Sequence, residues 1–496
     1  MSQFMEPLEP SSPHDSQTRA FSCGRTRREF IWETGAGFTS LALAYLLGRD
    51  GFLANSAAAG ETATKLINPL APKRPHFAPR AKSVIFLFMY GGPSQVDLFD
   101  PKPDLQAKSG KTIDIEQRKD SVKPGTLLGS TWKFQKYGQA GVEISDLYRN
   151  LAQHADEMAI IRSMYSDSFA HGSAILQMNT GSLFQGKPAL GSWLTYGLGS
   201  ESENLPSFVV VLDPRGGPIS GPPNWSAGYM PAAYQGTLLR ATGDPIVDLS
   251  PPSGVTRDEQ RQQLDLLGRL NEMHRAGREK ETELAARIAS YELAFRMQAA
   301  APEAADLSAE SEETKQLYGM DEDRSRDFGR KCLLARRLVE RGVRFVQIYS
   351  GGGHNDENWD AHSNVNANHE LHCGETDRPI AGLIADLKRR GLLDSTLIVW
   401  GGEFGRMPIS QNSLGRDHNP KGFTTWLAGG GVRGGQVVGS TDEIGYAAAE
   451  NPVHVHDLHA TILHLMGIDH TLLTYFHGGR EQRLTDVHGR LIEQIL

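Results

Sequence analysis

Residues Ser83–Met89 read SVIFLFM, seven residues of which only the first is polar. An uninterrupted apolar run of this length is typical of a strand that is covered on both faces, as the strands of parallel sheets are. Similar short runs recur along the chain, at Ala159–Ile161, Phe208–Leu212, Arg344–Ile348 and Thr396–Trp400. We therefore expect an α/β protein with a mostly parallel central sheet.

Helical patterns separate these runs, at about Ile144–Ala155, Arg326–Arg341 and Asn368–Arg390. Strands that alternate with helices predict a three-layer α/β/α sandwich. Ligands of such sheets bind at the carboxyl ends of the strands. The residues that follow each apolar run are therefore the first candidates for a functional site.

A different pattern covers about residues 256–301, which are charged and amphipathic. Apolar residues recur there at helical spacing, at Leu264, Leu267, Leu270 and Met273 and again at Leu284, Ile288 and Leu293. The pattern predicts one long helix or two paired helices inserted outside the sheet. A lid and a partner surface are alternatives to a simple packing role, which we favour.

Composition excludes several classes of protein. The chain has 496 residues, 39% of them hydrophobic, and 51 Lys and Arg against 59 Asp and Glu give a net charge of −8. It has no long basic run, so we expect no nucleic-acid partner. Three cysteines are too few for a disulfide-stapled scaffold or a four-cysteine zinc site.

The N-terminus has the order of an export signal. Arg27 and Arg28 precede a modest apolar stretch, Ala36–Leu47, and small residues follow at Ala57–Ala59. This order predicts a twin-arginine signal over residues 1–59 and a linker over 60–82. The apolar stretch is shorter than the roughly 20 residues of a membrane span, so no stable span is expected after cleavage. An amphipathic helix with a chance arginine pair is the alternative.

Histidines gather in the C-terminal part of the chain, where 12 of the 17 lie between His354 and His488. In the stretch NWDAHSN, Asp360 and His362 are two residues apart, so both side chains point the same way on an extended segment. His354 follows three glycines just before. Acids and histidines after a strand are typical ligands of zinc or manganese. A polar loop without a ligand is the alternative.

A second group follows the run that ends at Trp400. GGEFGRMP places Glu403, a candidate metal ligand, and Arg406, a candidate for binding a substrate oxyanion, directly after that strand. GRDHNP then adds Asp417 and His418 as further candidate ligands.

A third group, His171-Gly172-Ser173, precedes an apolar helix, and a helix N-terminus with small residues can bind an anion. His171 is a candidate metal ligand or acid–base group. Ser173 is a candidate catalytic residue, with a role as a helix N-cap as the alternative.

The histidine-rich stretch His454–Asp469 is interpreted as a structural helix. Asp457 suits its N-cap and Gly467 the position after its C-cap. Among its histidines, His456 is the one that we most expect near the functional site.

Five ordered motifs carry a resemblance to a known family: MYGGPSQVDLFDPKP, HGSAILQMNTG, NWDAHSN, GGEFGRMP with GRDHNP, and HDLHATILHLMGIDH. From about Ser83 to the C-terminus the chain resembles the bacterial family called domain of unknown function 1501. That family is placed in the alkaline phosphatase and sulfatase superfamily. The resemblance implies an alkaline phosphatase-like, sulfatase-like domain over residues 83–496 that cleaves phosphate or sulfate esters with a metal ion.

The order of superfamily motifs assigns roles to residues. It implies Asp97 as the first acid, His171 where the nucleophile stands, and His418 as the late histidine. The nucleophile position thus holds no Ser, Thr or Cys, which leaves a metal-bound hydroxide, His171 itself or Ser173. The resemblance implies Asp97, Asp360, His362, Glu403 and His418 as metal ligands. Together with His354 and Asp417 from the residue patterns above, these are the candidate ligands for zinc, manganese or calcium.

Two functions follow as hypotheses. The first is an exported metal-dependent hydrolase, in the periplasm or on the surface of a bacterium, that acts on an anionic ester such as a sulfated or phosphorylated glycan. Its other expected partner is the twin-arginine export machinery. The second is a non-catalytic surface binding or assembly protein that kept the fold.

Overall fold

The computed structural model describes residues 68–118, 121–251, 254–275, 282–353 and 357–496. The predicted signal over residues 1–59 and the candidate ligand His354 lie outside this range. The described residues belong to one compact unit, Ile67–Leu496.

A nine-stranded sheet runs through this unit in the order β14-β6-β13-β10-β1-β9-β7-β8, with β17 added to β6. Every pairing is parallel except the two that β13 makes with β10 and β6. The mostly parallel sheet predicted from the apolar runs is confirmed. Its strands are β1 (Ser83–Met89), β6 (Met158–Tyr165), β7 (Phe208–Val211), β8 (Thr237–Leu238), β9 (Phe345–Ser350), β10 (Thr396–Gly401), β13 (Phe423–Ala428), β14 (Gln436–Val438) and β17 (Val453–His454).

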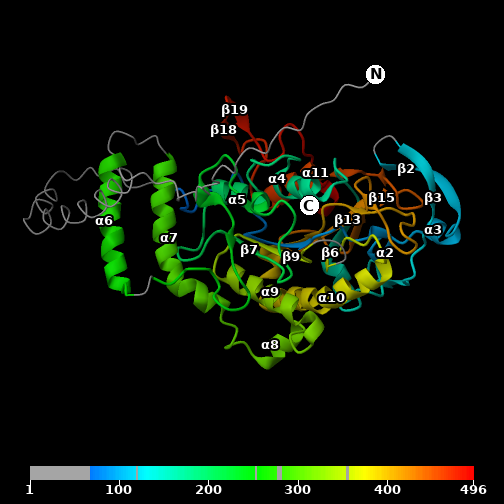
Figure 1. Ribbon diagram of the computed structural model, residues 1–496, viewed down its shortest axis with the longest axis horizontal. Helices are drawn as coiled ribbons and strands as arrows, with labels where there is room; N and C mark the ends of the chain where they lie inside the picture. The colour runs from blue at the N-terminus through cyan, green and yellow to red at the C-terminus, as the bar shows by residue number, and fades with distance from the viewer. Residues whose placement is uncertain (1–67, 119–120, 252–253, 276–281, 354–356) are drawn as a thin grey trace, which may run out of the picture. The chain divides into compact units, whose positions relative to one another are not determined.

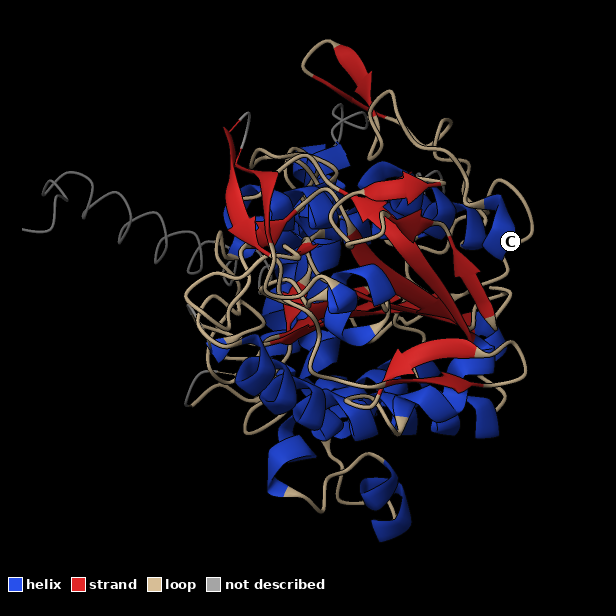
Figure 2. Cartoon of the chain, turned by 90° about the vertical axis from the view of Figure 1, so that its right-hand side faces the viewer, coloured by secondary structure: helices blue, strands red, loops and turns tan. Residues whose placement is uncertain are grey.

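Helices cover both faces of the sheet, and strand β1 shows why. Alternate side chains of β1 enter two separate cores, because successive residues of a strand point to opposite faces. One core contains α4 (His171–Thr180), α5 (Leu190–Leu198) and α11 (Val455–Leu465). The other contains α9 (Asp323–Glu340) and α10 (Val365–Arg389). Figures 1 and 2 show the sheet between these two helix layers, which confirms the α/β/α sandwich.

Short helices, 3-10 turns and two-stranded pairs lie outside the central sheet. The short helices are α2 (Gln95–Leu98), α3 (Pro103–Ala107) and α8 (Glu312–Leu317), with 3-10 turns η2 (Leu151–Glu157), η3 (Pro222–Trp225), η4 (Ala232–Tyr234), η6 (Leu393–Ser395) and η7 (Glu493–Ile495). The two-stranded pairs are β2 (Thr112–Arg118) with β3 (Ser121–Thr126), β4 (Phe134–Tyr137) with β5 (Val142–Ser145), β11 (Gly405–Arg406) with β12 (His418–Asn419), β15 (Ser440–Thr441) with β16 (Ala448–Glu450), and β18 (Tyr475–His477) with β19 (Arg480–Gln482).

The helix expected over Ile144–Ala155 is wrong. Ile144 belongs to β5, which pairs with β4, and η2 begins only at Leu151. Val142 and Ile144 are buried on either side of the less buried Glu143, as alternate residues of a strand are. Farther along, the Asp377 carboxylate accepts the backbone N–H groups of Asn150 and Leu151, so the start of η2 is set by a residue from α10.

Helix α11 begins earlier than the sequence indicated. His454 is its N-cap, and Asp457 is the third helical residue, whose carboxylate accepts the backbone N–H of His454 in a capping box. The expected N-cap role of Asp457 is therefore wrong by one turn. Gly467 has the left-handed conformation (φ 80°) one residue after the C-cap, as predicted.

The amphipathic segment holds two helices, α6 (Arg257–Arg275) and α7 (Thr282–Ala305). Figure 1 shows α6 outside α7, away from the sheet. Arg261 of α6 pairs with Glu292 of α7 at 2.8 Å.

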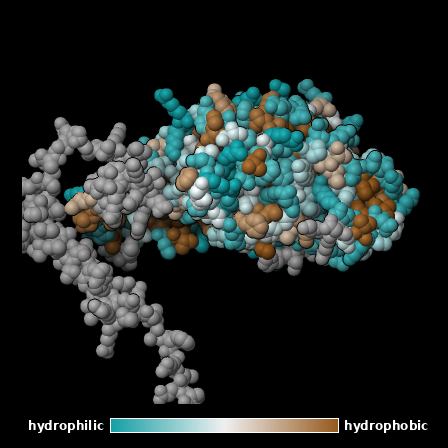
Figure 3. Space-filling view, turned by 90° about the horizontal axis from the view of Figure 1, so that it is seen from above, coloured by the Kyte–Doolittle hydropathy of each residue, from teal (hydrophilic) through white to brown (hydrophobic). Residues whose placement is uncertain are grey.

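No helix in the described part of the chain is long and apolar enough to cross a membrane. Figure 3 shows hydrophobic patches scattered over a mostly hydrophilic face.

Candidate metal centre

Three parallel strands, β6, β9 and β10, bring the candidate residues to one edge of the sheet. His171 begins α4 shortly after β6 ends, Asp360 and His362 follow β9, and Glu403 follows β10. His418 lies in β12, directly opposite Arg406 of β11. Because the carboxyl ends of parallel strands share one edge, residues far apart in sequence meet there.

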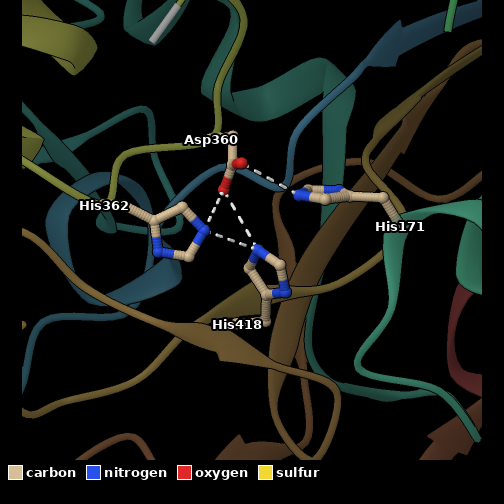
Figure 4. Close-up of side chains that lie close together, drawn as sticks. All are labelled: His171, Asp360, His362 and His418. Atoms are coloured by element: carbon tan, nitrogen blue, oxygen red, sulfur yellow. Dashed lines mark hydrogen bonds and ion pairs between the residues drawn. The ribbon is translucent and has the colours of Figure 1, made fainter. Parts of the chain in front are cut away.

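Four side chains converge at this edge: His171, Asp360, His362 and His418 (Figure 4). Their ligand atoms all lie within 4.8 Å of one another. Asp360 Oδ1 is 2.8 Å from His362 Nε2 and 3.0 Å from His418 Nε2. Asp360 Oδ2 is 3.2 Å from His171 Nε2, and the Nε2 atoms of His362 and His418 are 2.9 Å apart.

The other ring nitrogen of each histidine is held by an oxygen. His171 Nδ1 is 2.6 Å from Glu403 Oε1, His362 Nδ1 is 2.5 Å from Gln411 Oε1, and His418 Nδ1 is 2.7 Å from the Phe169 carbonyl. Carboxylate and carbonyl oxygens only accept hydrogen bonds, so each Nδ1 carries a proton. Each Nε2 is then the atom that can take a metal ion or a second proton.

The arrangement fits a metal ion. Three Nε2 atoms and a carboxylate face one another, and His171 Nε2 lies 3.2 Å from Asp360 Oδ2. A carboxylate, carbonyl or amide oxygen behind each ligating imidazole is the usual support of a metal-binding histidine. Three imidazole nitrogens and one carboxylate suit zinc, whereas calcium prefers a shell of oxygens. The donor set therefore does not suit calcium, one of the three metals expected from the sequence.

Comparison with known proteins places the chain in a family. The family described as "Protein of unknown function (DUF1501)" matches residues 81–496. The chain belongs to this family. No curated protein matches it.

Solved structures that resemble this DUF1501 member are remote. The PsFucS1 sulfatase from Pseudoalteromonas sp. is 14% identical, with 82% of this chain and 72% of that one covered and a TM-score of 0.34. A protein in the alkaline phosphatase superfamily from Vibrio parahaemolyticus is 9% identical, with 84% and 75% covered and a TM-score of 0.33. The phosphonate monoester hydrolase SpPMH from Silicibacter pomeroyi is 13% identical, with 70% and 71% covered and a TM-score of 0.32.

In this DUF1501 chain, Asp360 contacts all three histidines of the cluster and Arg406. Burial works to raise its pKa, but the Arg406 guanidinium and the three histidines hold that pKa well below its usual range. Asp360 is therefore a carboxylate at any physiological pH. Burial lowers the pKa of His418 to about 4. For His171, the hydrogen bonds to Asp360 and Glu403 outweigh the effect of burial and raise the pKa to about 9.

Arg406 contacts the centre through Asp360. Its side chain is fully buried, and the guanidinium donates to the carbonyls of Gly91 and Gly92 and, at 2.7 Å, to Asp360 Oδ1. These hydrogen bonds hold Asp360 in place. The contact of Arg406 with a substrate oxyanion stays a prediction.

Three expected ligands lie beside the cluster and not in it. Asp97 is buried in an ion pair with Arg416 at 2.8 Å and accepts the Ser94 hydroxyl. Glu403 stands behind His171, and its carboxylate also accepts the Gly91 N–H. The Asp417 carboxylate accepts the N–H of His418 and is 4.0 Å from His362 Nδ1.

Ser173 lies two residues into α4, and its hydroxyl is 2.7 Å from Ser168 Oγ. The N-cap of α4 is Ala170, so the N-cap interpretation of Ser173 is wrong. The Ser173 hydroxyl instead donates back to the Ala170 carbonyl.

Gln411 and the Phe169 carbonyl were not predicted from the sequence. Both come from loops, and neither a lone glutamine nor a backbone carbonyl gives a sequence signal. Gly91, in contrast, belongs to the glycine pair that follows β1 in the sequence. Its φ is 111°, and an added Cβ would lie 2.5 Å from the Asp360 backbone nitrogen.

Proposed function

We propose that the protein is an exported, metal-dependent hydrolase of phosphate or sulfate esters. One observation carries the proposal: three imidazole Nε2 atoms and the Asp360 carboxylate converge at the carboxyl edge of the sheet, each imidazole backed by an oxygen on Nδ1. The motif order that resembles the alkaline phosphatase and sulfatase superfamily supports the ester class. The twin-arginine pattern supports export, with a signal over 1–59, a linker over 60–82 and the catalytic domain over 83–496.

The residues have distinct tasks in this proposal. His171, Asp360, His362 and His418 hold the ion, for which zinc is the first choice and manganese the second. The ion supplies Lewis acidity toward an oxygen of the anionic ester. Glu403 keeps the proton of His171 on Nδ1, so that Nε2 faces the centre. Arg406 balances and orients Asp360.

Access to the centre is limited but present. The side chain of His362 is 28% exposed and those of His171 and His418 are each 15% exposed, whereas Glu403 and Arg406 are fully buried. An ester can therefore approach from the side of His362. Burial of the two supporting residues keeps water away from the charges that orient the ligands.

The test combines metal content with turnover. Protein purified without chelators is analysed by mass spectrometry for zinc, manganese and calcium, and then assayed on a panel of aryl phosphates and sulfates. We expect about one equivalent of ion. His362→Ala should lose both the ion and the activity, whereas His477→Ala, which removes an exposed histidine of β18, should keep both.

Two outcomes overturn the proposal. One is a wild-type protein that folds and hydrolyses esters without any bound ion. The other is a protein that binds the ion through His362 and turns over no ester of the panel, which favours the alternative of a binding protein that kept the fold.

A further inference from the structure

A second group of histidines lines a cavity of about 460 Å³ next to α4. Helices α4 and α11 lie side by side (Figure 1), joined by a hydrogen bond from His459 Nε2 to the Met178 carbonyl. The cavity opens at the N-terminal end of α11. Its principal lining residues are Tyr165, Asp167, His454, His456, His488 and Arg490.

The cavity and the metal centre share one short segment. Tyr165 and Asp167 line the cavity, while Ser166 between them contacts the Glu403 carbonyl at 3.4 Å. The same segment continues to Phe169, whose carbonyl holds His418. A molecule bound in the cavity therefore lies next to the loop that supports the metal ligands.

The charges in the cavity do not suit a second anionic group. Two carboxylates, Asp167 and Asp457, face one guanidinium, Arg490. Asp457 accepts the backbone N–H groups of His454 and Arg490, at 2.9 and 2.7 Å. A phosphate or sulfate here would meet two fixed carboxylates with no excess of positive charge to offset them.

The imidazoles offer neutral donors and acceptors. His454 Nδ1 accepts the backbone N–H of His456, so the proton of this ring is on Nε2, which donates to Asp167 at 3.1 Å. His456 is 5% exposed, and its Nδ1 is buried without a hydrogen-bond partner. A hydroxyl group can pair with an accessible imidazole nitrogen in either tautomer, because it both donates and accepts.

Flat rings form the remaining wall. The rings of His456 and His488 stack with centroids 5.3 Å apart and an angle of 24° between their planes. The rings of Tyr165 and His454 are 4.9 Å apart. Aromatic faces suit an apolar C–H surface, whereas the neighbouring imidazole nitrogens suit hydroxyls. A saturated ring that bears hydroxyls presents both surfaces at once.

We propose that this cavity binds an uncharged, hydroxyl-bearing ring, that is, a sugar residue of the ester substrate. The inference rests on the proposed function, because it names the class of molecule that carries the ester. In this arrangement the sugar ring occupies the cavity while the ester group reaches the centre on the other side of Ser166. The cavity supplies binding energy and selects carbohydrate esters over simple aryl esters.

Binding is tested first, without turnover. The full chain is titrated with neutral methyl glycosides and followed by saturation-transfer NMR, with inorganic sulfate as competitor. We expect His488→Ala to weaken glycoside binding at least about tenfold and His477→Ala to leave it unchanged. Competition by sulfate, or no binding by any neutral glycoside, overturns the proposal.

Kinetics separate this inference from the proposed function. His488→Ala should lower kcat/KM for a sugar 6-phosphate or 6-sulfate through KM, and leave kcat/KM for 4-nitrophenyl phosphate or sulfate unchanged. Equal loss on both kinds of ester contradicts a sugar site. A wild type inactive on every ester refutes the hydrolase, while the NMR titration still decides whether the cavity binds a sugar.

Discussion

The proton on Nδ1 of His171 determines what the other ring nitrogen can do. Glu403 is fully buried and accepts the Gly91 N–H and the His171 proton, so its carboxylate has no competing solvent contact. With Nδ1 held in this way, Nε2 is the nitrogen that faces the centre, where it can carry a second proton or bind an ion. In the proposed centre, Glu403 would therefore act on the ion through His171 and not by direct coordination.

The substitution Glu403→Gln tests this role. Its amide can donate to Nδ1 and so move the ring proton to Nε2, which blocks the metal-binding atom. We expect a loss of about 10–100-fold in metal affinity with the fold retained, measured by chelator competition and thermal unfolding. Glu450→Gln, at an exposed position of β16, is the matched control. Unchanged affinity in Glu403→Gln would show that the Glu403 charge does not tune His171.

The sequence predicted the residues of the cluster better than the residues that hold them in place. Asp360 and His362 were predicted as a pair because their spacing is local. The contact of His362 with Gln411 spans 49 residues and that of His418 with Phe169 spans 249, so no local pattern reports them. The hydrogen bonds from Arg406 to the Gly91 and Gly92 carbonyls, which lie after a different strand, could not be predicted from local sequence either.

At the scale of elements, α11 carries histidines as core residues. His459 is fully buried, and burial lowers its pKa to about 3; burial also lowers the pKa of His456 to about 4. The unfolded chain takes up these protons near the ordinary value of 6.5, whereas the folded chain does not. Stability contributed by the neutral rings is therefore complete above pH 6.5 and is lost as the pH falls toward these lowered values.

This linkage gives a measurable pH dependence. Between pH 6.5 and about 4, the free energy of unfolding of chelator-treated protein should fall with acidity. His459→Gln keeps a side-chain donor for the Met178 carbonyl but cannot titrate, so the slope should decrease by up to about 1.4 kcal/mol per pH unit. Urea unfolding at several pH values measures it, with His477→Gln as the exposed control. An identical slope in the His459 variant would contradict the assignment.

Local sequence predicted which segments form strands. The residue at which a helix begins depended on contacts with residues far away in the sequence. The strand runs needed only their own apolar residues, and all five became strands of the sheet. The failed helix near Ile144 shows the limit, because η2 starts where Asp377 of α10 accepts its first N–H groups. The N-cap of α11 was displaced for a similar reason: His454 first pairs with β6 and only then begins the helix.

At the scale of the whole molecule, the metal centre exists only in the folded chain. Its four converging residues come from positions 171 to 418 and follow three different strands of the sheet. An unfolded chain offers no such set, so an ion held by these residues would bind after folding. A twin-arginine signal is consistent with this requirement, because that route exports proteins that have already folded.

Export is predicted to depend on Arg27 and Arg28 while metal binding does not. With both arginines changed to lysine, the protein should remain in the cytoplasm of a bacterial host at its full length, with its metal content unchanged. The wild type and the control Arg25→Lys, which alters a neighbouring arginine outside the pair, should reach the periplasm in shortened form. Cell fractionation followed by intact-mass and metal analysis measures all three. Equal periplasmic amounts of the double variant would refute the signal, whereas loss of metal from it would show that the ion is acquired only after export.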